Sequence, residues 1–223
     1  MKKLVLITAA VAVLSSSSAF AKTEGNYVGV DLHKAVTSSR YINNGSAGTS
    51  GIGLNAAQDQ SKTGLGVSYK YAFNFDKFFV APGVFFERIG TNTLLAVDPE
   101  FGESYISDRY FQIKNRYGIR ADFGYDITDT FAAYVTGGIT RTGYKSNTNI
   151  NGAGAEQSDG IATLAKSKLG FMYGVGAIQH LNDNVSLGVE YNTQALTAVG
   201  ANPNNQRIKS RIDLYKLTLA YHF

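Results

Sequence analysis

The chain has 223 residues, a net charge of +4 and no cysteine, and 44% of its residues are hydrophobic. This composition excludes a disordered chain, because the apolar content is ordinary and the net charge is low. The missing cysteines exclude a disulfide framework and a cysteine metal site. Beyond the N-terminus, no apolar run approaches the roughly 18–20 residues of a spanning helix, so a helical membrane protein is disfavoured.

The first 21 residues have the features of a secretory signal peptide. A basic N-terminus precedes an apolar stretch over 4–14, and Ala19 and Ala21 supply the small residues that a signal peptidase reads. We therefore expect a signal peptide over 1–21 and a mature domain over 22–223. Two basic residues lie in the signal, so the overall charge does not indicate nucleic-acid binding, and no nucleic-acid partner is expected.

Alternation of apolar and polar residues dominates the mature chain. It is clear over 63–73, 113–125 and 215–223, where apolar and aromatic residues share one parity and small or charged residues share the other. A period of two is typical of β-strands. The pattern predicts eight strands, over about 26–34, 63–73, 78–87, 109–125, 130–144, 169–181, 185–196 and 208–223.

Short turns and long loops alternate between these strands. Asn and Asp suit the short turns, because they tolerate unusual backbone angles and bond their own main chain. The short turns are predicted at 74–77, 126–129 and 182–184, and the long loops at about 35–62, 88–108, 145–168 and 197–207. Such asymmetry is typical of outer-membrane barrels, and the absence of a linker indicates a single domain.

The volume of the lumen decides which face points inward. An eight-stranded barrel has an interior just wide enough for side chains. Large residues such as Tyr69, Phe73 and Phe123 would overfill it, whereas the glycine-rich face leaves room for charges. We therefore predict an all-β, eight-stranded antiparallel up-and-down transmembrane β-barrel, with a secreted soluble barrel as the alternative. Apolar and polar residues alternate less strictly over the predicted strands 78–87 and 130–144.

The inward parity predicts four acidic and four basic side chains inside the barrel. These residues are Asp31, Lys70, Glu87, Arg116, Arg120, Asp122, Glu190 and Lys216. Unpaired charges in a dry lumen are costly, so pairing is expected. Strand adjacency favours one cluster of Asp31, Lys216 and Glu190 and one pair of Glu87 with Arg116. A gated channel is one interpretation, and a lumen closed by ion pairs is favoured over it.

No motif of an enzyme or a metal site stands out. The three histidines lack the spacing of a zinc helix, and His33 is followed by Lys34 and Ala35 rather than by the His-x-Ser pattern of outer-membrane deacylases. His33 is interpreted as an interfacial residue near one rim, and His180 and His222 are placed near the short turns. We expect no enzyme, no metal and no cofactor.

The long loops are the candidates for binding, because exposed loops on a rigid scaffold usually carry function. The acidic and aromatic loop over 88–108 is the preferred contact surface. Its candidate contact residues are Asp98, Glu100, Phe101, Glu103, Tyr105 and Asp108. The alternative is a solvated loop that only shields the barrel.

The whole mature chain resembles the opacity-type surface antigens and OmpA-like small outer-membrane barrels. The resemblance rests on the signal peptide, the alternating strands, Gly174-x-Gly176, the run 187–191 and the alternating C-terminus. It implies location in the outer membrane of a Gram-negative bacterium, contact with outer-membrane lipid and lipopolysaccharide, and a monomer. It also implies that the barrel-assembly machinery reads the final residues Leu217, Leu219, Tyr221 and Phe223.

The function expected from this resemblance is surface display. The protein would act as a surface antigen or adhesin-like protein that contacts a host or extracellular ligand through its loops. A small porin-like channel or a route for apolar solutes is the alternative, and a purely structural membrane protein is the third.

Overall fold

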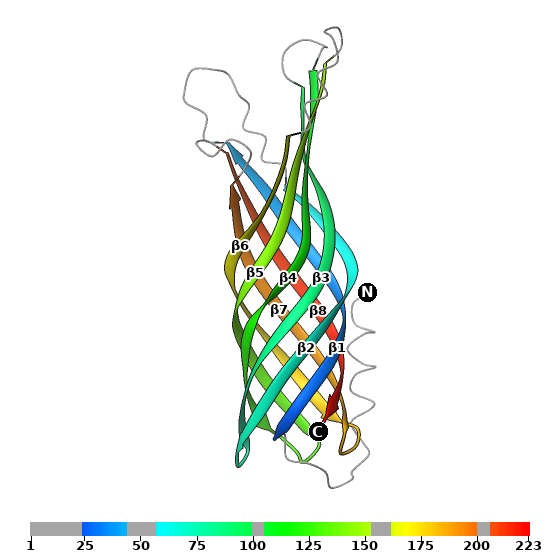
Figure 1. The fold of residues 1–223 in the computed structure, drawn as a ribbon, viewed down its shortest axis with the longest axis vertical. Helices are drawn as coiled ribbons and strands as arrows, with labels where there is room; N and C mark the ends of the chain where they lie inside the picture. Colours follow the sequence, from blue (N-terminus) through cyan, green and yellow to red (C-terminus); the bar gives the residue numbers. More distant parts are fainter. Residues whose placement is uncertain (1–23, 44–56, 100–104, 153–161, 200–205) are drawn as a thin grey trace, which may run out of the picture.

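The computed structural model describes residues 24–43, 57–99, 105–152, 162–199 and 206–223. They form β1 (Gly25–Asn43), β2 (Ala57–Phe75), β3 (Phe78–Pro99), β4 (Tyr105–Asp126), β5 (Phe131–Gly152), β6 (Ala162–His180), β7 (Val185–Val199) and β8 (Gln206–His222). Each strand pairs antiparallel with the next, and β8 pairs with β1 to close the barrel (Figure 1). The described residues include no helix long and apolar enough to cross a membrane. The predicted eight-stranded up-and-down barrel is confirmed.

Three short turns close one end of the barrel, where the C-terminus also lies (Figure 1). Only Asp76 and Lys77 separate β2 from β3, and Asp76 has a φ of 62°. Aspartate tolerates this left-handed region better than most residues. In the turn between β6 and β7, the Asn182 side chain accepts hydrogen bonds from the main chain of Asn184 and Val185 at 2.9 and 2.8 Å.

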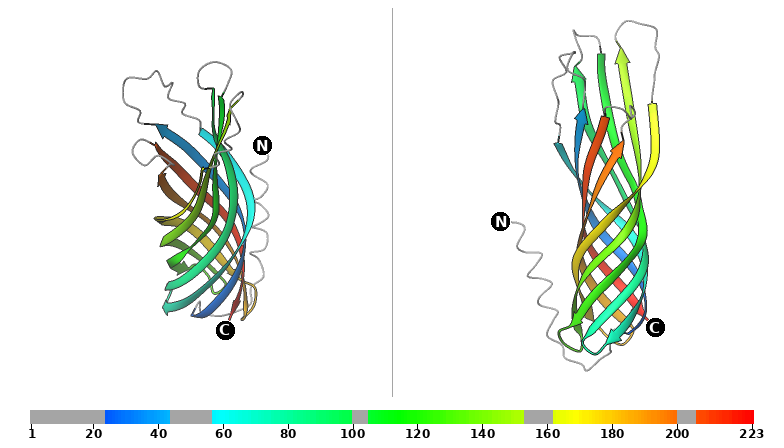
Figure 2. Two further views of the ribbon diagram at one scale, coloured as in Figure 1. Left: turned by 45° about the horizontal axis from the view of Figure 1, so that its top comes forward. Right: turned by 90° about the vertical axis from the view of Figure 1, so that its left-hand side faces the viewer.

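The strands are longer, and the opposite loops shorter, than the alternation predicted. The predicted loop over 88–108 is wrong for most of its length, because β3 continues to Pro99 and β4 begins at Tyr105. Figure 2 shows β3, β4 and β5 projecting beyond the other strands at this end. The hydrogen-bonded ladder continues there while the alternation of apolar and polar residues stops, so parity does not predict these strand ends.

Two irregularities mark the level at which the projecting strands leave the barrel. The β3–β4 register shifts between Arg88 and Thr91, where Gly90 has a φ of 66°. The β4–β5 register shifts between Ile113 and Asn115, which leaves Lys114 as the extra residue of a bulge. A bulge bends a strand and redirects side chains, and the left-handed φ explains the glycine at position 90.

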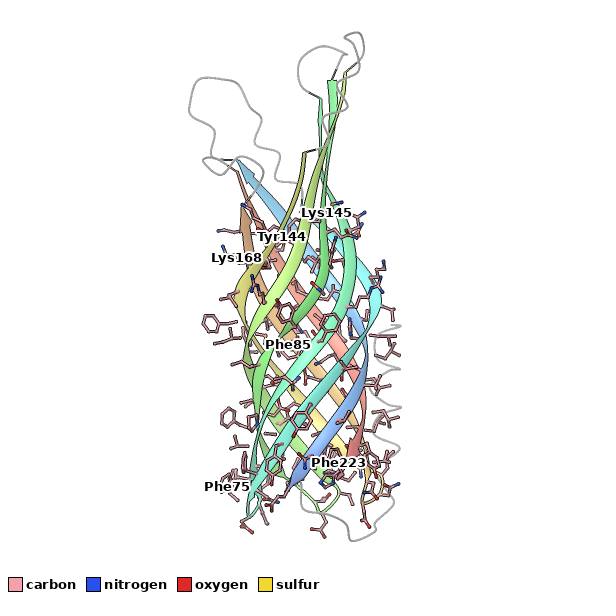
Figure 3. All side chains as sticks on the ribbon, viewed as in Figure 1. Phe75, Phe85, Tyr144, Lys145, Lys168 and Phe223 are labelled. Atoms are coloured by element: carbon pink, nitrogen blue, oxygen red, sulfur yellow. The ribbon has the colours of Figure 1, made fainter. Side chains whose placement is uncertain are left out.

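The outer surface of the barrel is a band of exposed apolar side chains. Examples are Val30 on β1, Val67 on β2, Ile119 on β4 and Leu219 on β8, with exposed fractions of 53 to 59%. Aromatic residues gather near the short turns, where Figure 3 shows Phe75 and Phe223. Such a band with an aromatic girdle suits contact with lipid.

The interior has three layers along the barrel axis. An apolar layer lies near the short turns and comprises Tyr27, Ala72, Phe79, Ala81, Ala132, Tyr134, Ile178 and Ala220. A second apolar layer lies toward the long strand ends and comprises Ala35, Ile89, Phe111, Ile113, Tyr144, Leu196, Ile212 and Leu214. Charged side chains fill the space between the two layers.

Two glycines explain why β3 and β5 sort poorly by parity. Phe79 and Tyr134 point inward and are almost fully buried. A Cβ atom at Gly124 would overlap the Phe79 ring, and one at Gly176 would overlap the Tyr134 ring. Each large ring therefore occupies space that a glycine on the neighbouring strand leaves free.

This packing predicts different effects for two glycine substitutions. Gly124→Ala forces the Phe79 ring to move and should lower the free energy of unfolding by about 1–3 kcal/mol. Gly137→Ala is the control, because a Cβ atom there meets nothing within 4 Å and should change stability by less than about 0.5 kcal/mol. Urea unfolding in phospholipid vesicles, followed by tyrosine fluorescence, measures both. Equal stability of the two variants would contradict the packing argument.

Candidate functional site

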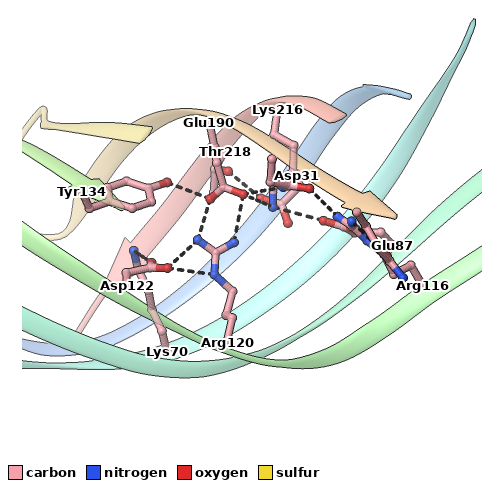
Figure 4. A network of polar contacts seen from close by, with 12 residues as sticks. Asp31, Lys70, Glu87, Arg116, Arg120, Asp122, Tyr134, Glu190, Lys216 and Thr218 are labelled. Atoms are coloured by element: carbon pink, nitrogen blue, oxygen red, sulfur yellow. Dashed lines mark hydrogen bonds and ion pairs between the residues drawn. The ribbon is translucent and has the colours of Figure 1, made fainter. Parts of the chain in front are cut away.

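The structure places all eight predicted interior charges on the inner face of the barrel (Figure 4). They come from β1, β2, β3, β4, β7 and β8. Seven of them form one continuous chain of ion pairs in which the sign of the charge alternates. The short-turn end of this chain begins with Lys70, whose Nζ lies 3.2 Å from Asp122 Oδ2.

Arg120 joins Asp122 to Glu190 across the lumen. Its Nη2 lies 2.6 Å from Asp122 Oδ1 and 2.5 Å from Glu190 Oε2. Arg120 and Asp122 lie on β4, whereas Glu190 lies on β7, which is not a neighbour of β4. The narrow lumen of an eight-stranded barrel allows such contacts between strands that are far apart in the sheet.

Lys216 continues the chain toward the long strand ends. Its Nζ lies 2.9 Å from Glu190 Oε1 and 3.1 Å from Glu87 Oε1. Glu87 in turn pairs with Arg116, with Nη2 at 2.6 Å and Nε at 2.7 Å from Oε2. The side chains of Glu87 and Arg116 are fully buried, so this pair has no exposure to solvent.

Neutral side chains complete the hydrogen bonding of the charged layer. Tyr134 Oη donates to Glu190 at 2.9 Å, and Asn192 Nδ2 donates to it at 2.6 Å. Arg116 Nη2 donates to Asn192 at 2.8 Å, and Arg116 Nη1 to Gln194 at 3.4 Å. Buried charges are tolerated when they are both paired and hydrogen-bonded, as they are here.

Asp31 is placed differently from the cluster predicted for it. Lys216 and Glu190 are paired, but Asp31 accepts a hydrogen bond from Thr218 at 2.5 Å instead of joining their ion pairs. Its Oδ2 has no hydrogen-bond partner among the described residues. Asp31 lines an enclosed space of about 40 Å³, together with Arg120 and Glu190. That volume and polarity suit one or a few water molecules.

The prediction for His33 is wrong, because it is not an interfacial residue. Its side chain points inward and is 1% exposed, packed against the backbone face of Gly64. His180 is also buried, near Tyr27, while the His222 ring stacks on Tyr27 with the ring centroids 4.5 Å apart. His180 and His222 therefore lie at the short-turn end, where they were predicted.

The arrangement of the lumen is that of a closed interior. Four cationic side chains pair with three anionic ones, and an apolar layer covers them on each side. The described residues include no group of three or more His, Asp or Glu side chains that could hold a metal ion. The charged layer can therefore hold strands together and block the passage of solutes.

The other predicted site residues lie outside the lumen. Leu217, Leu219, Tyr221 and Phe223 all face outward on or just after β8. In the predicted contact loop, Asp98 lies on β3, and Tyr105 and Asp108 lie on β4. Glu100, Phe101 and Glu103 lie outside the described residues, as does the predicted signal peptide over 1–21.

A comparison with protein families agrees with the closed β-barrel of the structure. Residues 6–223 match the family described as the outer membrane protein beta-barrel domain. The chain belongs to this family. The protein is therefore an outer-membrane β-barrel. Comparison with curated protein sequences finds no match.

Several solved structures share this fold at low sequence identity. The attachment invasion locus protein Ail of Yersinia pestis is 16% identical, with a TM-score of 0.43 and coverage of 90% of this chain and 100% of Ail. OprG of Pseudomonas aeruginosa is 16% identical, with a TM-score of 0.47 and coverage of 90% and 96%. The outer membrane protease OmpT of Escherichia coli is 11% identical, with a TM-score of 0.47 and coverage of 93% and 100%.

The ionic chain predicts a large loss of stability when its central carboxylate is removed. Glu190→Gln leaves Arg120 and Lys216 buried without a shared counter-ion, and should lower the free energy of unfolding by about 3–5 kcal/mol. Asp183→Asn, in the exposed turn before β7, is the control and should change stability by less than about 0.5 kcal/mol. Denaturant unfolding in vesicles measures both.

A double variant tests whether the loss comes from charge imbalance. Glu190→Gln combined with Lys216→Met restores the balance of charges and should recover part of the lost stability. If the two substitutions are additive instead, the Glu190–Lys216 pair does not couple and the ionic chain is not a unit.

Proposed function

We propose that the protein is a surface-display protein that contacts an extracellular ligand, of the surface antigen or adhesin-like kind. One observation carries this proposal: the lumen is closed by an ionic layer between two apolar layers, while β3, β4 and β5 project beyond the barrel (Figure 2). A closed lumen supports no solute flow along the barrel axis. The projecting strands offer a surface on the outer side, where function usually lies in such scaffolds.

The hairpin of β3 and β4 is the preferred contact element within this proposal. This hairpin contains Asp98, Tyr105 and Asp108. The ladder between its two strands extends to the pair Pro99–Ile106. A hairpin whose backbone is already paired needs less ordering on binding, which lowers the entropy cost of binding. We propose a binding role without catalysis, together with a cleaved signal peptide, a monomeric state and recognition of the C-terminal strand by the barrel-assembly machinery.

Shortening the hairpin tests the contact role. Replacing residues 98–107 by Asn-Gly joins Val97 to Asp108, which already face each other in the ladder, through a turn that suits two-residue hairpins. Cells that display this variant should bind at least about tenfold less to epithelial cells and to matrix-coated wells. The barrel should stay folded in the membrane.

A matched variant shortens a different hairpin. Replacing residues 149–161 by Asn-Gly trims the β5–β6 connection beyond the Thr148–Ala162 pair, and this variant should keep most of the binding. Unchanged binding after the β3–β4 truncation, or a large and steady conductance of the purified protein in planar bilayers, would contradict the proposal.

A seam in the barrel wall favours a second candidate function, a lateral route for apolar solutes. The described β6–β7 ladder runs from His180–Ser186 to Met172–Gln194 and stops, although β6 begins at Ala162 and β7 continues to Val199. Figure 2 shows the two strands separating toward the long strand ends. Unpaired backbone groups are costly in lipid, so an early end of a ladder marks a place where the wall can open.

The side chains around this seam are apolar on the lipid side and mixed on the inner side, where the buried Gln194 amide lies against Gly170. Phe171 faces outward with 75% exposure, and Leu196 lies inside, in the apolar layer above Arg116. An apolar solute that enters from the bilayer side would meet Phe171 first, and Leu196 and Gln194 on the inner side of the wall.

Crosslinking the seam separates this route from surface contact. Continuing the ladder would place Phe171 opposite Ala195, so Phe171→Cys with Ala195→Cys bridges the seam, and the chain has no other cysteine. Oxidation or a short thiol crosslinker should reduce decane uptake by cells to the level of cells without the protein, and the single variant Phe171→Cys should not respond. Uptake that is unaffected by the crosslink would contradict the lateral route.

A further inference from the structure

The ionic chain ends in a buried cation with a single carboxylate partner. Within the chain, Arg120 and Lys216 each contact two carboxylates. Arg116, at the end toward the long strand ends, contacts only Glu87 among the described residues (Figure 4). The chain thus contains four cations and three carboxylates, and the remaining interior carboxylate, Asp31, does not join it.

The other donors of Arg116 meet neutral amides. Its Nη2 donates to Asn192 at 2.8 Å, whereas its Nη1 donates to Gln194 Oε1 at 3.4 Å. The same Gln194 amide contacts Thr142 Oγ1, which lies 3.0 Å from Nε2 and 3.3 Å from Oε1. Arg116, Gln194 and Thr142 are all fully buried. Gln194 is therefore the most weakly held partner of a buried guanidinium, at a position where an anion would be a stronger acceptor.

Gln194 lies where the seam between β6 and β7 begins. It forms the last pair of the described ladder, with Met172, and its side chain points into the lumen. Its amide lies against Gly170, the next inward residue on β6, where a Cβ atom would be only 2.6 Å from Nε2. Because Gly170 has no side chain, the Gln194 amide occupies the space between the seam and Arg116.

We propose that this place binds the carboxylate of a single-chain amphiphile, such as a medium-chain fatty acid, that enters through the seam and displaces the Gln194 amide. A carboxylate has the planar shape of the amide that it replaces. One of its oxygens can accept from Arg116 Nη1 and the other from the Thr142 hydroxyl, while the apolar chain extends outward past exposed Phe171. This inference deepens the second candidate function and rests on it, because it names the solute class.

The charge of the ionic chain favours a head group with one negative charge. One bound carboxylate raises the chain to four cations and four carboxylates. A neutral alcohol is a weaker acceptor for the guanidinium, and a cationic amine adds charge where cations are already in excess. An alkane leaves the Gln194 amide in place, because it offers no acceptor in exchange.

Titration of decanoate into the purified mature protein in phosphatidylcholine nanodiscs tests this site. NMR of the ¹⁵N-labelled protein follows the Arg116 Nε–H and Gln194 side-chain signals, which report on the site and not on decanoate dissolved in the lipid. Both signals should shift until the site is saturated. Decanol and decylamine should bind at least about tenfold more weakly. Millimolar acetate, which has the head group without the chain, should not compete.

Substitutions separate the two donors from the amide that they hold. Gln194→Ala removes the competing amide and should tighten decanoate binding at least about threefold. Arg116→Gln should weaken it at least about tenfold, but this change leaves Glu87 without one partner and can unfold the barrel. Thr142→Val removes only the neutral donor and should weaken binding about threefold. Arg211→Gln, at an exposed arginine on β8, is the matched control and should stay within twofold.

Closing the seam provides the decisive comparison. Oxidised Phe171→Cys/Ala195→Cys should show no decanoate-induced shifts, and reduction should restore them. Equal decanoate binding by the wild type, Gln194→Ala and Thr142→Val, or binding that persists after oxidation, overturns the proposal.

Failure of this inference is distinguishable from failure of the lateral route. If decanoate does not bind but the crosslink blocks decane uptake, this inference is overturned and the route stands. If decanoate binds as described but the crosslink leaves decane uptake unchanged, the site is supported and the route for apolar solutes is overturned.

Discussion

The carboxylate of Glu190 ties the interior of the barrel together. It accepts hydrogen bonds from Arg120 on β4, Tyr134 on β5, Lys216 on β8 and Asn192 on its own strand. Because a charge in a dry lumen is tolerable only with partners, these contacts hold several strands to one register. A register shift of one residue would break these contacts and turn cations toward lipid. Each cation near the bilayer centre would then cost about 2–4 kcal/mol.

The two apolar layers on either side of this carboxylate close the interior of the barrel. The Phe79 and Tyr134 rings fill the lumen on the short-turn side, and Phe111, Ile113 and Leu214 fill it on the other side. Each apolar layer keeps water from the ion pairs and so strengthens them. The same arrangement fills the axis of the barrel with side chains, which is why the proposed functions use the outer surface or the wall.

The alternation of apolar and polar residues alone predicts the eight strands and the eight inward charges. With a period of two, it determines which face of the sheet each side chain points to. It cannot predict the link from Arg120 to Glu190 or from Lys216 to Glu87, since these residues lie on strands that are not neighbours. Such contacts depend on the diameter of the closed lumen. Parity is right for His33, which shares the inward parity of Asp31, and the interfacial interpretation was wrong because it relied on the position of His33 near one rim.

The alternation of apolar and polar residues ends where the lipid-facing band ends. Below the rim, every strand must present apolar groups outward, so the fold itself fixes the chemistry. Above it, β3 and β4 continue through bulges at Gly90 and Lys114, whereas the β6–β7 ladder already ends at Met172, within the lipid-facing wall. Closing the barrel requires neither the extension of β3 and β4 nor the early end of the β6–β7 ladder. Each feature is therefore available for contact with a ligand, a lipid or a solute. The fold therefore describes the scaffold and does not by itself specify a role.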